Sequence, residues 1–561
     1  MTDNSSKDGS KKSALDLWLS KSKKSTPEKG IKKMPENAKT VLSHGQERLW
    51  LLDQIYPNQN LYNYAHRYCI DGPIHLDILV QSFQLLAKEN EVLRSNYEIV
   101  GATCVQLVKH ERIPIELYNL SKLNSIDQKK EIELQKEHFL TLSFDLSKDP
   151  LFQLFIFDLG ANKYELFLVL HHIIGDGWSL GIINEMVSKF YRQLSSQESR
   201  TPHDERLQYK DVAFWQKNQK VKEKDLDYWT TKLSGKLPVL DLPKSSVKAE
   251  NPFEGNSFVK ALAPALSKQL NELSKERNTT PYVLFLTAYK VFLSKYCKQN
   301  DILVASPFSN RDTKELEKII GFFNETVVLR TQIQSDITFI ELVESVKQST
   351  FEALEHKNVP FDTLVKELKI ERQIGENPIF QTMFLYNKAN KQLDLGEGIE
   401  SKEQMLDLGT SKFDLTLFVN ETSDHLELVF EHRNCFDSEI ILQMSQHFEQ
   451  LLQNIIKEPN QKISELSLLT DKEQQLILTE WNNNNVPIPS INSIQELIFK
   501  KEYETKIAIS HAGQSINYLE LDQWSSQIAI QLLQKGVSTN DFVGLYCHRS
   551  VDMIVGMMGI I

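Results

Sequence analysis

Cysteine is scarce in this chain, with five in 561 residues, scattered and never in CxxC spacing. An odd number without metal-ligand spacing excludes a zinc framework and predicts reduced thiols in a cytoplasmic protein. No apolar run reaches the roughly 18 residues of a membrane span, and the N-terminus lacks the apolar stretch of a secretory signal. Positive charge is also in deficit. Lys and Arg number 64 against 75 Asp and Glu, and a net charge of -11 argues against a general nucleic-acid binder.

What the chain does have is an ordinary globular composition, 41% hydrophobic and 25% charged, and its length predicts about three to five packing units. Residues 76–86 carry apolar side chains at three- and four-residue intervals, which predicts a helix. Residues 151–157 and 166–170 are short apolar runs typical of buried strands, and the turn residues 160–162 between them predict a hairpin. A second round follows, with a helix at 282–296 and strands at 302–305 and 327–329. Such a mixture predicts two α+β lobes.

The two ends of the chain differ from this pattern. Residues 1–40 are rich in Lys and Ser, which predicts a disordered tail. The patch ALDLWL at 14–19 is either a docking element for an upstream protein or an incidental apolar patch. Asparagines and prolines at 482–489 predict a linker. The remainder resembles the opening of another α/β domain and stops inside the apolar run 553–561, which has no evident packing partner. We therefore expect a piece of a longer protein.

The strongest chemical signal is HHIIGDGWS at 171–179, directly after a predicted buried strand. Loops that follow such strands commonly hold catalytic or binding residues. Adjacent histidines on extended backbone point to opposite faces, so His171 and His172 do not form an easy metal pair, and we expect no metal site. One histidine acting as an acid, base or positioning group fits better, and Asp176 is placed to orient the loop or pair with a base. The alternative is a buried histidine pair beside a turn aspartate.

This segment resembles the HHxxxDG signature of nonribosomal peptide synthetase condensation domains. Further segments resemble other motifs of that family in the same order: LSHGQERLW (42–50), EVLRS (91–95), YKDVAFW (209–215), IGFF (320–323), HKNVPFD (356–362) and RQIGENPIF (372–380). The resemblance covers about residues 41–469. One departure is visible, because Asn324 and Glu325 stand where the family usually has Val and Asn, and substrate preference is put in doubt there. Residues 496–561 resemble the start of an adenylation domain.

The resemblance implies an α+β fold in which two chloramphenicol-acetyltransferase-like lobes form a V-shaped pseudo-dimer, followed by an incomplete α/β segment. The division that we expect is a disordered or docking tail at 1–40, an N-terminal lobe at 41–215, a C-terminal lobe at 216–470, a linker at 471–495 and a truncated start of an adenylation domain at 496–561.

The implied reaction is amide formation. The amine of a carrier-bound aminoacyl thioester attacks an upstream carrier-bound acyl or peptidyl thioester. The family match places His172 nearest the chemistry, as a group that orients the amine and manages its proton or as a stabiliser of the tetrahedral intermediate. The supporting residues that we expect are His171, Asp176 paired with Arg94, Gly177 beside the phosphopantetheine arm, Trp178 in the channel wall or the core, and Arg311.

Partners implied by the resemblance are donor and acceptor carrier proteins that present substrates on phosphopantetheine arms, with an upstream part of a synthetase docking at 1–40. We expect no cofactor bound by this chain, no nucleic acid and no membrane. One alternative is a starter domain that N-acylates the first amino acid from an acyl-CoA or an acyl carrier. Another is a non-catalytic scaffold that recruits partner enzymes, which the retained His172 disfavours. His171 likewise disfavours heterocyclisation, and the segment downstream disfavours epimerisation.

Overall fold

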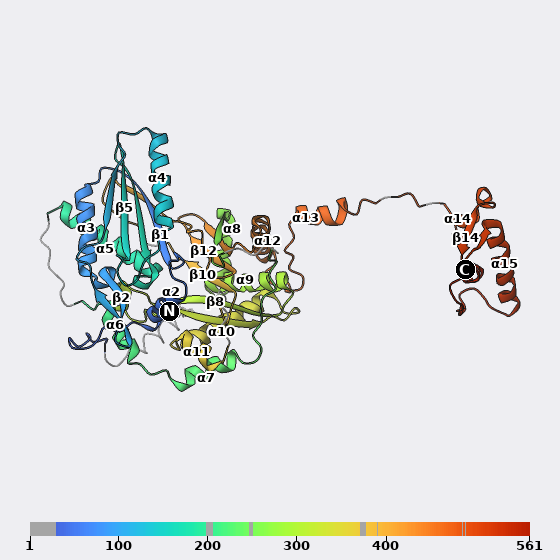
Figure 1. Cartoon of the computed structure of the whole chain (residues 1–561), viewed down its shortest axis with the longest axis horizontal. Helices are drawn as coiled ribbons and strands as arrows, with labels where there is room; N and C mark the ends of the chain where they lie inside the picture. The colour runs from blue at the N-terminus through green and yellow to red at the C-terminus, as the bar shows by residue number, and fades with distance from the viewer. Residues whose placement is uncertain are drawn as a thin grey trace, which may run out of the picture. The chain divides into compact units, whose positions relative to one another are not determined.

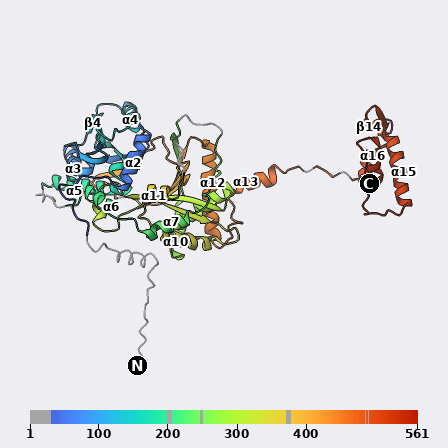
Figure 2. The same ribbon diagram turned by 60° about the horizontal axis from the view of Figure 1, so that its bottom comes forward.

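The computed structural model describes residues 30–197, 206–245, 251–370, 377–389, 391–484, 486–488 and 490–561. The apolar patch at 14–19, interpreted as either a docking element or an incidental patch, and most of the segment 372–380 therefore lie outside the described residues. The chain divides into two compact units, one up to Lys472 and one from Glu473 (Figures 1 and 2).

The first lobe is built on a five-stranded sheet in the order β11-β1-β6-β5-β4, antiparallel except between β4 and β5. The predicted hairpin is confirmed, since β5 and β6 pair directly and Gly160, Ala161 and Asn162 take positive φ in the turn. The predicted helix at 76–86 is also confirmed as α3, which packs against α5. The elements are α2 (His44–Ile55), β1 (Asn63–Asp71), α3 (Leu76–Glu89), β2 (Ser95–Val100), β3 (Thr103–Val108), β4 (Ile115–Asn119), α4 (Ser125–Leu140), β5 (Phe152–Gly160), β6 (Lys163–His171), α5 (Gly177–Ser195), α6 (Tyr209–Lys217) and β11 (Glu400–Met405).

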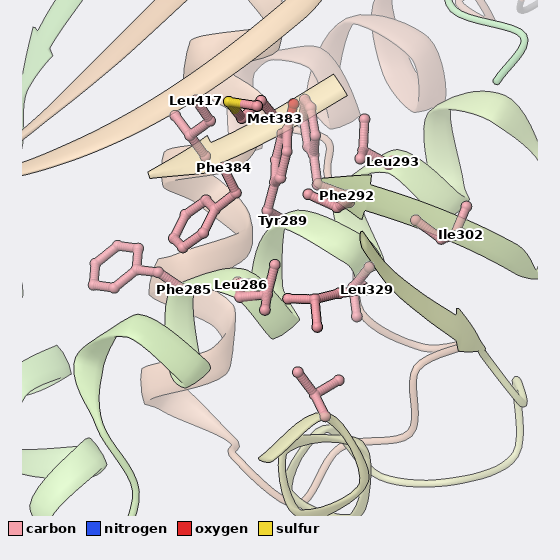
Figure 3. Packing of buried hydrophobic residues seen from close by; sticks show 14 of the residues in the cluster. Phe285, Leu286, Tyr289, Phe292, Leu293, Ile302, Leu329, Met383, Phe384 and Leu417 are labelled. Atoms are coloured by element: carbon pink, nitrogen blue, oxygen red, sulfur yellow. The ribbon is translucent and has the colours of Figure 1, made fainter. Parts of the chain in front are cut away.

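The second lobe holds a six-stranded sheet in the order β7-β13-β12-β10-β8-β9, and its central helix is α9. Thr280 caps that helix and Pro281 opens it, which is where helices favour these residues. Tyr289 and Phe292 of this helix pack against Phe384 and Phe448, and Figure 3 shows part of this core. The predicted helix and strands of the second round are confirmed. The elements are α7 (Glu223–Lys232), β7 (Gly255–Ala261), α8 (Pro264–Glu276), α9 (Pro281–Cys297), β8 (Asp301–Ser309), β9 (Asn324–Gln332), α10 (Phe339–Glu355), α11 (Phe361–Glu367), β10 (Thr382–Asn387), β12 (Leu415–Glu421), β13 (Leu426–Arg433) and α12 (Ser438–Lys457).

Two segments from the second half of the chain complete the first lobe. Strand β11 pairs with β1 over six residues, from His66–Met405 to Asp71–Glu400. The core of the first lobe also contains Leu316, Ile319, Ile320, Phe323, Leu393 and Leu395. The expected boundary between the lobes at 215/216 therefore does not assign every residue to its lobe, because the chain returns twice to the first lobe after it has entered the second.

The second unit has a small core of four buried residues, Ile516, Leu521, Val551 and Val555. The expectation that the run 553–561 has no packing partner is wrong, because this run lies in α16 and packs against α15. Gly559 permits that contact, since a Cβ there would lie 2.7 Å from the Ser525 carbonyl oxygen. Over the described residues, no helix is long and apolar enough to cross a membrane. The elements are α13 (Asp471–Gln475), α14 (Ile494–Ile498), β14 (Ile507–His511), β15 (Gln514–Asn517), α15 (Tyr518–Gln534) and α16 (Val551–Ile560).

Candidate active site

His172 directly follows the last residue of β6, and one of its two ring nitrogens is hydrogen-bonded to the backbone. Its backbone N–H donates to the Tyr62 carbonyl at 2.7 Å, and its ring Nδ1 lies 2.7 Å from the Gly175 carbonyl oxygen. Because a carbonyl oxygen only accepts, Nδ1 must carry the proton, and a neutral ring then presents a lone pair at Nε2. The edge-on rings of Tyr64 and Phe322, at centroid distances of 4.4 and 4.8 Å, fix the plane of the imidazole.

Electrostatics keep this imidazole neutral. The side chain is 7% exposed. Burial is the main cause that lowers the pKa of His172, and the positive charge of Lys412 adds to it, while the hydrogen bond to Gly175 opposes both; the resulting pKa is about 3. At neutral pH the ring is therefore an acceptor at Nε2 and not a cation.

His171 has the opposite arrangement. Its Nδ1 accepts a hydrogen bond from the Ile173 N–H at 3.1 Å, so in the neutral ring the proton sits on Nε2. Its ring contacts Phe144, whereas that of His172 contacts Tyr64 and Phe322, which confirms that the two histidines face opposite ways. Burial is the main cause that lowers the pKa of His171 to about 3, and the neighbouring His172 (when protonated) and Lys412 add to it. His171 thus supports the loop backbone.

Asp176 is fully buried and joins α5 to the returning segment 311–323. As the N-cap of α5 it accepts from the Ser179 N–H at 2.9 Å and the Ser179 hydroxyl at 2.7 Å. The Phe323 N–H donates to its second oxygen at 3.0 Å. The Arg311 guanidinium donates to both oxygens, at 3.0 and 3.3 Å, and lies 3.8 Å above the Phe323 ring. The Asp176 carboxylate therefore has a full set of donors and serves the architecture of the site.

The predicted partner of Asp176 was wrong. Arg94 donates instead to the carbonyls of Ala87, Lys88 and His110, at 2.8, 3.3 and 3.1 Å. The Arg311 side chain is only 2% exposed and takes the place expected for Arg94.

Gly177 and Trp178 line a cavity of about 2360 Å³. A Cβ at Gly177 would meet no atom within 4 Å, so its missing side chain leaves open space and relieves no clash. Trp178 is 51% exposed and donates its indole N–H to the Glu317 carbonyl at 3.0 Å, which excludes the core role considered for it. His172 is not itself a lining residue, but Tyr64, which touches its ring, is.

The departure at Asn324 and Glu325 falls on the first residues of β9, whose successive side chains point to opposite faces. Asn324 lines the cavity. Burial raises the pKa of the Glu325 carboxyl to about 7 against the opposing charges of Arg48 and Lys357. The two unusual residues therefore face different surroundings.

Sequence reasoning missed four residues of this site. Phe322 and Ser179 lie inside segments that were singled out, but neither was given a role. Nothing in the sequence marks Tyr64 or Lys412, because both reach the histidines only through the fold. No group of His, Cys, Asp or Glu that could hold a metal ion occurs among the described residues.

The comparisons with known proteins agree with this geometry. The family "Condensation domain" matches residues 36–478, and "AMP-binding enzyme" matches residues 499–561. The chain belongs to the condensation-domain family, and a segment similar to AMP-binding enzymes follows.

Similar curated proteins are far longer than this chain. Gramicidin S synthase 2 of Brevibacillus brevis is 31% identical over 538 residues, which is 95% of this chain and 12% of that protein. Surfactin synthase subunit 1 of Bacillus subtilis (strain 168) is 30% identical over 529 residues, 93% of this chain and 14% of that protein. The chain therefore spans less than a sixth of the length of these relatives.

Solved structures show the same fold. A four-domain nonribosomal peptide synthetase bound to AMP and glycine has a TM-score of 0.69 at 21% identity, covering 93% of this chain and 41% of that one. The X-domain of teicoplanin biosynthesis in complex with OxyB has a TM-score of 0.68 at 18% identity, covering 80% and 99%. The first unit thus has the two-lobed, chloramphenicol-acetyltransferase-like fold of condensation domains.

Proposed function

We propose that the chain forms amide bonds in nonribosomal peptide synthesis. A carrier-bound acyl or peptidyl thioester is the donor, and the amine of a carrier-bound aminoacyl thioester is the acceptor. The amine nitrogen bonds to the thioester carbonyl carbon, the C–S bond breaks, and the nitrogen loses a proton as the donor thiol is released. The observation that carries this proposal is the His172 ring, neutral and tied at Nδ1 to Gly175, which leaves Nε2 as an acceptor.

His172 acts by orienting the amine and handling its proton. A free α-amino group has a pKa of about 7.7–8.0, so selecting its neutral form at pH 7 costs only about 1–1.4 kcal/mol. A strong base is therefore unnecessary. Holding the amine and thioester in near-attack geometry is worth about 7–11 kcal/mol. General-base help typically raises the rate by about 10²–10⁴-fold, which corresponds to a smaller free energy.

The substrates come on phosphopantetheine arms of donor and acceptor carrier proteins, and the chain itself binds no further cofactor. The open space beside Gly177 suits such an arm, because a side chain there would project into the cavity. Five free cysteines support a reducing, cytoplasmic compartment.

The test is amide formation by the full chain, followed by mass spectrometry. Donors are acyl- and aminoacyl-pantetheine thioesters and an acyl-CoA, with aminoacyl-pantetheine acceptors. Product that vanishes in His172→Ala but persists in His138→Ala, a change at an exposed residue of α4, supports the proposal. The best donor separates peptide extension from acylation of a first amino acid. A folded chain that yields no product with any donor, loaded carrier proteins included, contradicts the proposal and favours a recruiting scaffold.

A further inference from the structure

Lys412 lies just before β12 and places a cation beside the catalytic histidine. It lines the large cavity, and its ammonium is 5.3 Å from the centre of the Tyr62 ring and 5.9 Å from that of Tyr64. Both distances are within the range of a cation–π contact. The Tyr64 ring in turn touches the His172 ring at 4.4 Å. The Tyr64 ring therefore contacts both the ammonium and the imidazole.

The backbone of Lys412 is anchored, whereas its charge is not paired. Its carbonyl oxygen accepts from the Arg433 guanidinium at 2.9 Å. Within the described part of the chain, no carboxylate is in ion-pair distance of its Nζ and no hydrogen-bond acceptor holds it; its contacts are the two rings. Lys244 shows the usual alternative, an ion pair with Asp414 at 2.7 Å.

Leaving an ammonium unpaired in a partly desolvated wall costs free energy. Burial lowers the pKa of Lys412, and the charge of Glu431, which lines the same cavity, opposes that effect. The negative charge of Glu431 favours the protonated form of the amine. An ammonium in the cavity wall without a carboxylate of the described residues in ion-pair distance is suited to a negative partner that arrives with the substrate.

We propose that the Lys412 ammonium stabilises the negative charge that develops on the donor thioester carbonyl oxygen when the acceptor amine attacks. This inference rests on the proposed function. As the C–N bond forms, the carbonyl π electrons move to oxygen, and Nζ–H donates a hydrogen bond to that oxygen without giving up its proton. When the intermediate collapses, the electron pair re-forms the carbonyl and the thiolate leaves with the proton that the nitrogen loses.

His172 and Lys412 then have complementary tasks. His172 accepts at Nε2 and serves the amine, whereas Lys412 donates and serves the oxygen. A preorganised donor of this kind is strongest where water is excluded, and removing one typically lowers kcat by about 10²–10³-fold. The same positive charge also helps to keep the His172 ring neutral.

The experiment compares Lys412→Met with Lys412→Arg in the full chain, using the acyl- and aminoacyl-pantetheine assay. Lys388→Met, which removes an exposed charge elsewhere on the cavity wall, is the matched control. We expect Lys412→Met to lower kcat by about 10²–10³-fold with little change in KM. Lys412→Arg should keep most of the rate, and Lys388→Met should equal the wild type. Equal kcat in Lys412→Met and the wild type overturns the inference, as does a loss that appears only in KM and only for donors with a carboxylate.

A binding measurement removes the dependence on turnover and on the stability of one variant. An anionic phosphonate analogue of the tetrahedral intermediate, built on pantetheine, should bind about 10²–10³-fold more weakly to Lys412→Met than to the wild type. An uncharged thioether analogue should bind equally to both. Lys412→Gln, which keeps a neutral hydrogen-bond donor, should bind the anionic analogue with an affinity between those of the wild type and Lys412→Met. Parallel losses for both analogues would reduce Lys412 to a packing role. A wild-type chain that makes no amide refutes the proposed function, whereas an active wild type with an equally active Lys412→Met refutes only this inference.

Discussion

Removing the Asp176 carboxylate should strongly destabilise the first lobe and not only lower the activity. The carboxylate holds the Arg311 guanidinium at 3.0 and 3.3 Å, with side-chain exposures of 0% and 2%. Asp176→Ala strands that cation away from water, which costs about 3–5 kcal/mol. The same change removes the N-cap of α5, typically worth about 1 kcal/mol, and the acceptor for the Phe323 N–H. This loss is a large fraction of the roughly 5–15 kcal/mol stability of a typical domain.

The assay is urea unfolding of the full chain together with amide hydrogen exchange of α5 and of residues 311–323, which report the first lobe separately. Arg192→Ala is the control, because its ion pair with Asp394 is more than half exposed and such pairs contribute about 0–1 kcal/mol. In Asp176→Ala/Arg311→Met the two losses should be less than additive, with a coupling of about 1–3 kcal/mol. An Asp176→Ala protein that is soluble, melts normally and is inactive would refute the reasoning and return Asp176 to the chemistry.

Three further predictions follow from other contacts. Because the pKa of His172 is about 3, kcat/KM between pH 5 and 8 should follow the acceptor amine alone, and an additional acid limb that disappears in His172→Ala would contradict this. Lys290 is fully buried, and burial lowers its pKa to about 7. The unfolded chain therefore binds more protons between pH 7 and about 10.4, and stability rises with pH in that range. Lys290→Met should flatten that rise, and an unchanged pH profile of unfolding would count against the reasoning. A Cβ at Gly321 would lie 1.9 Å from the Tyr209 ring, so Gly321→Ala should destabilise the chain by about 1–3 kcal/mol or more. A Cβ at Gly177 would meet no atom within 4 Å, so Gly177→Ala should melt like the wild type but lose activity. Equal melting temperatures for the two variants would refute this contrast.

Local structure was predictable wherever the signal is local. The hairpin of β5 and β6 follows from two apolar runs and the residues between them, and α9 follows from its periodicity. The candidate site was predictable because HHIIGDGWS places its histidines and aspartate on one short loop. Strand β11 gave no such signal, since its sequence ESKEQM has no apolar face and lies at the sheet edge with most side chains exposed.

The partner of Asp176 was not predictable for a related reason. Arg311 is 135 residues away in sequence, and it arrives only because the chain returns to the first lobe between the two strands β8 and β9. Once there, Leu316, Ile319 and Phe323 are buried in the first lobe, so apolar packing brings the guanidinium to the carboxylate. Neither charge nor periodicity in the sequence distinguishes Arg94 from Arg311 as the partner. The difference lies in which lobe buries the apolar side chains around each arginine.

The adjacent histidines show how one repeated residue acquires two roles. His171 is the last residue of β6, and its Nδ1 accepts from the backbone N–H of the turn that follows. His172 is the first residue of that turn, and its Nδ1 donates to the Gly175 carbonyl that closes it. Each ring therefore uses Nδ1 in a hydrogen bond to the loop backbone, His171 as acceptor and His172 as donor. In the neutral rings, Nε2 of His171 is then a donor and Nε2 of His172 an acceptor. Only His172 leaves an acceptor for a substrate N–H, which supports the proposal that the second histidine serves the amine.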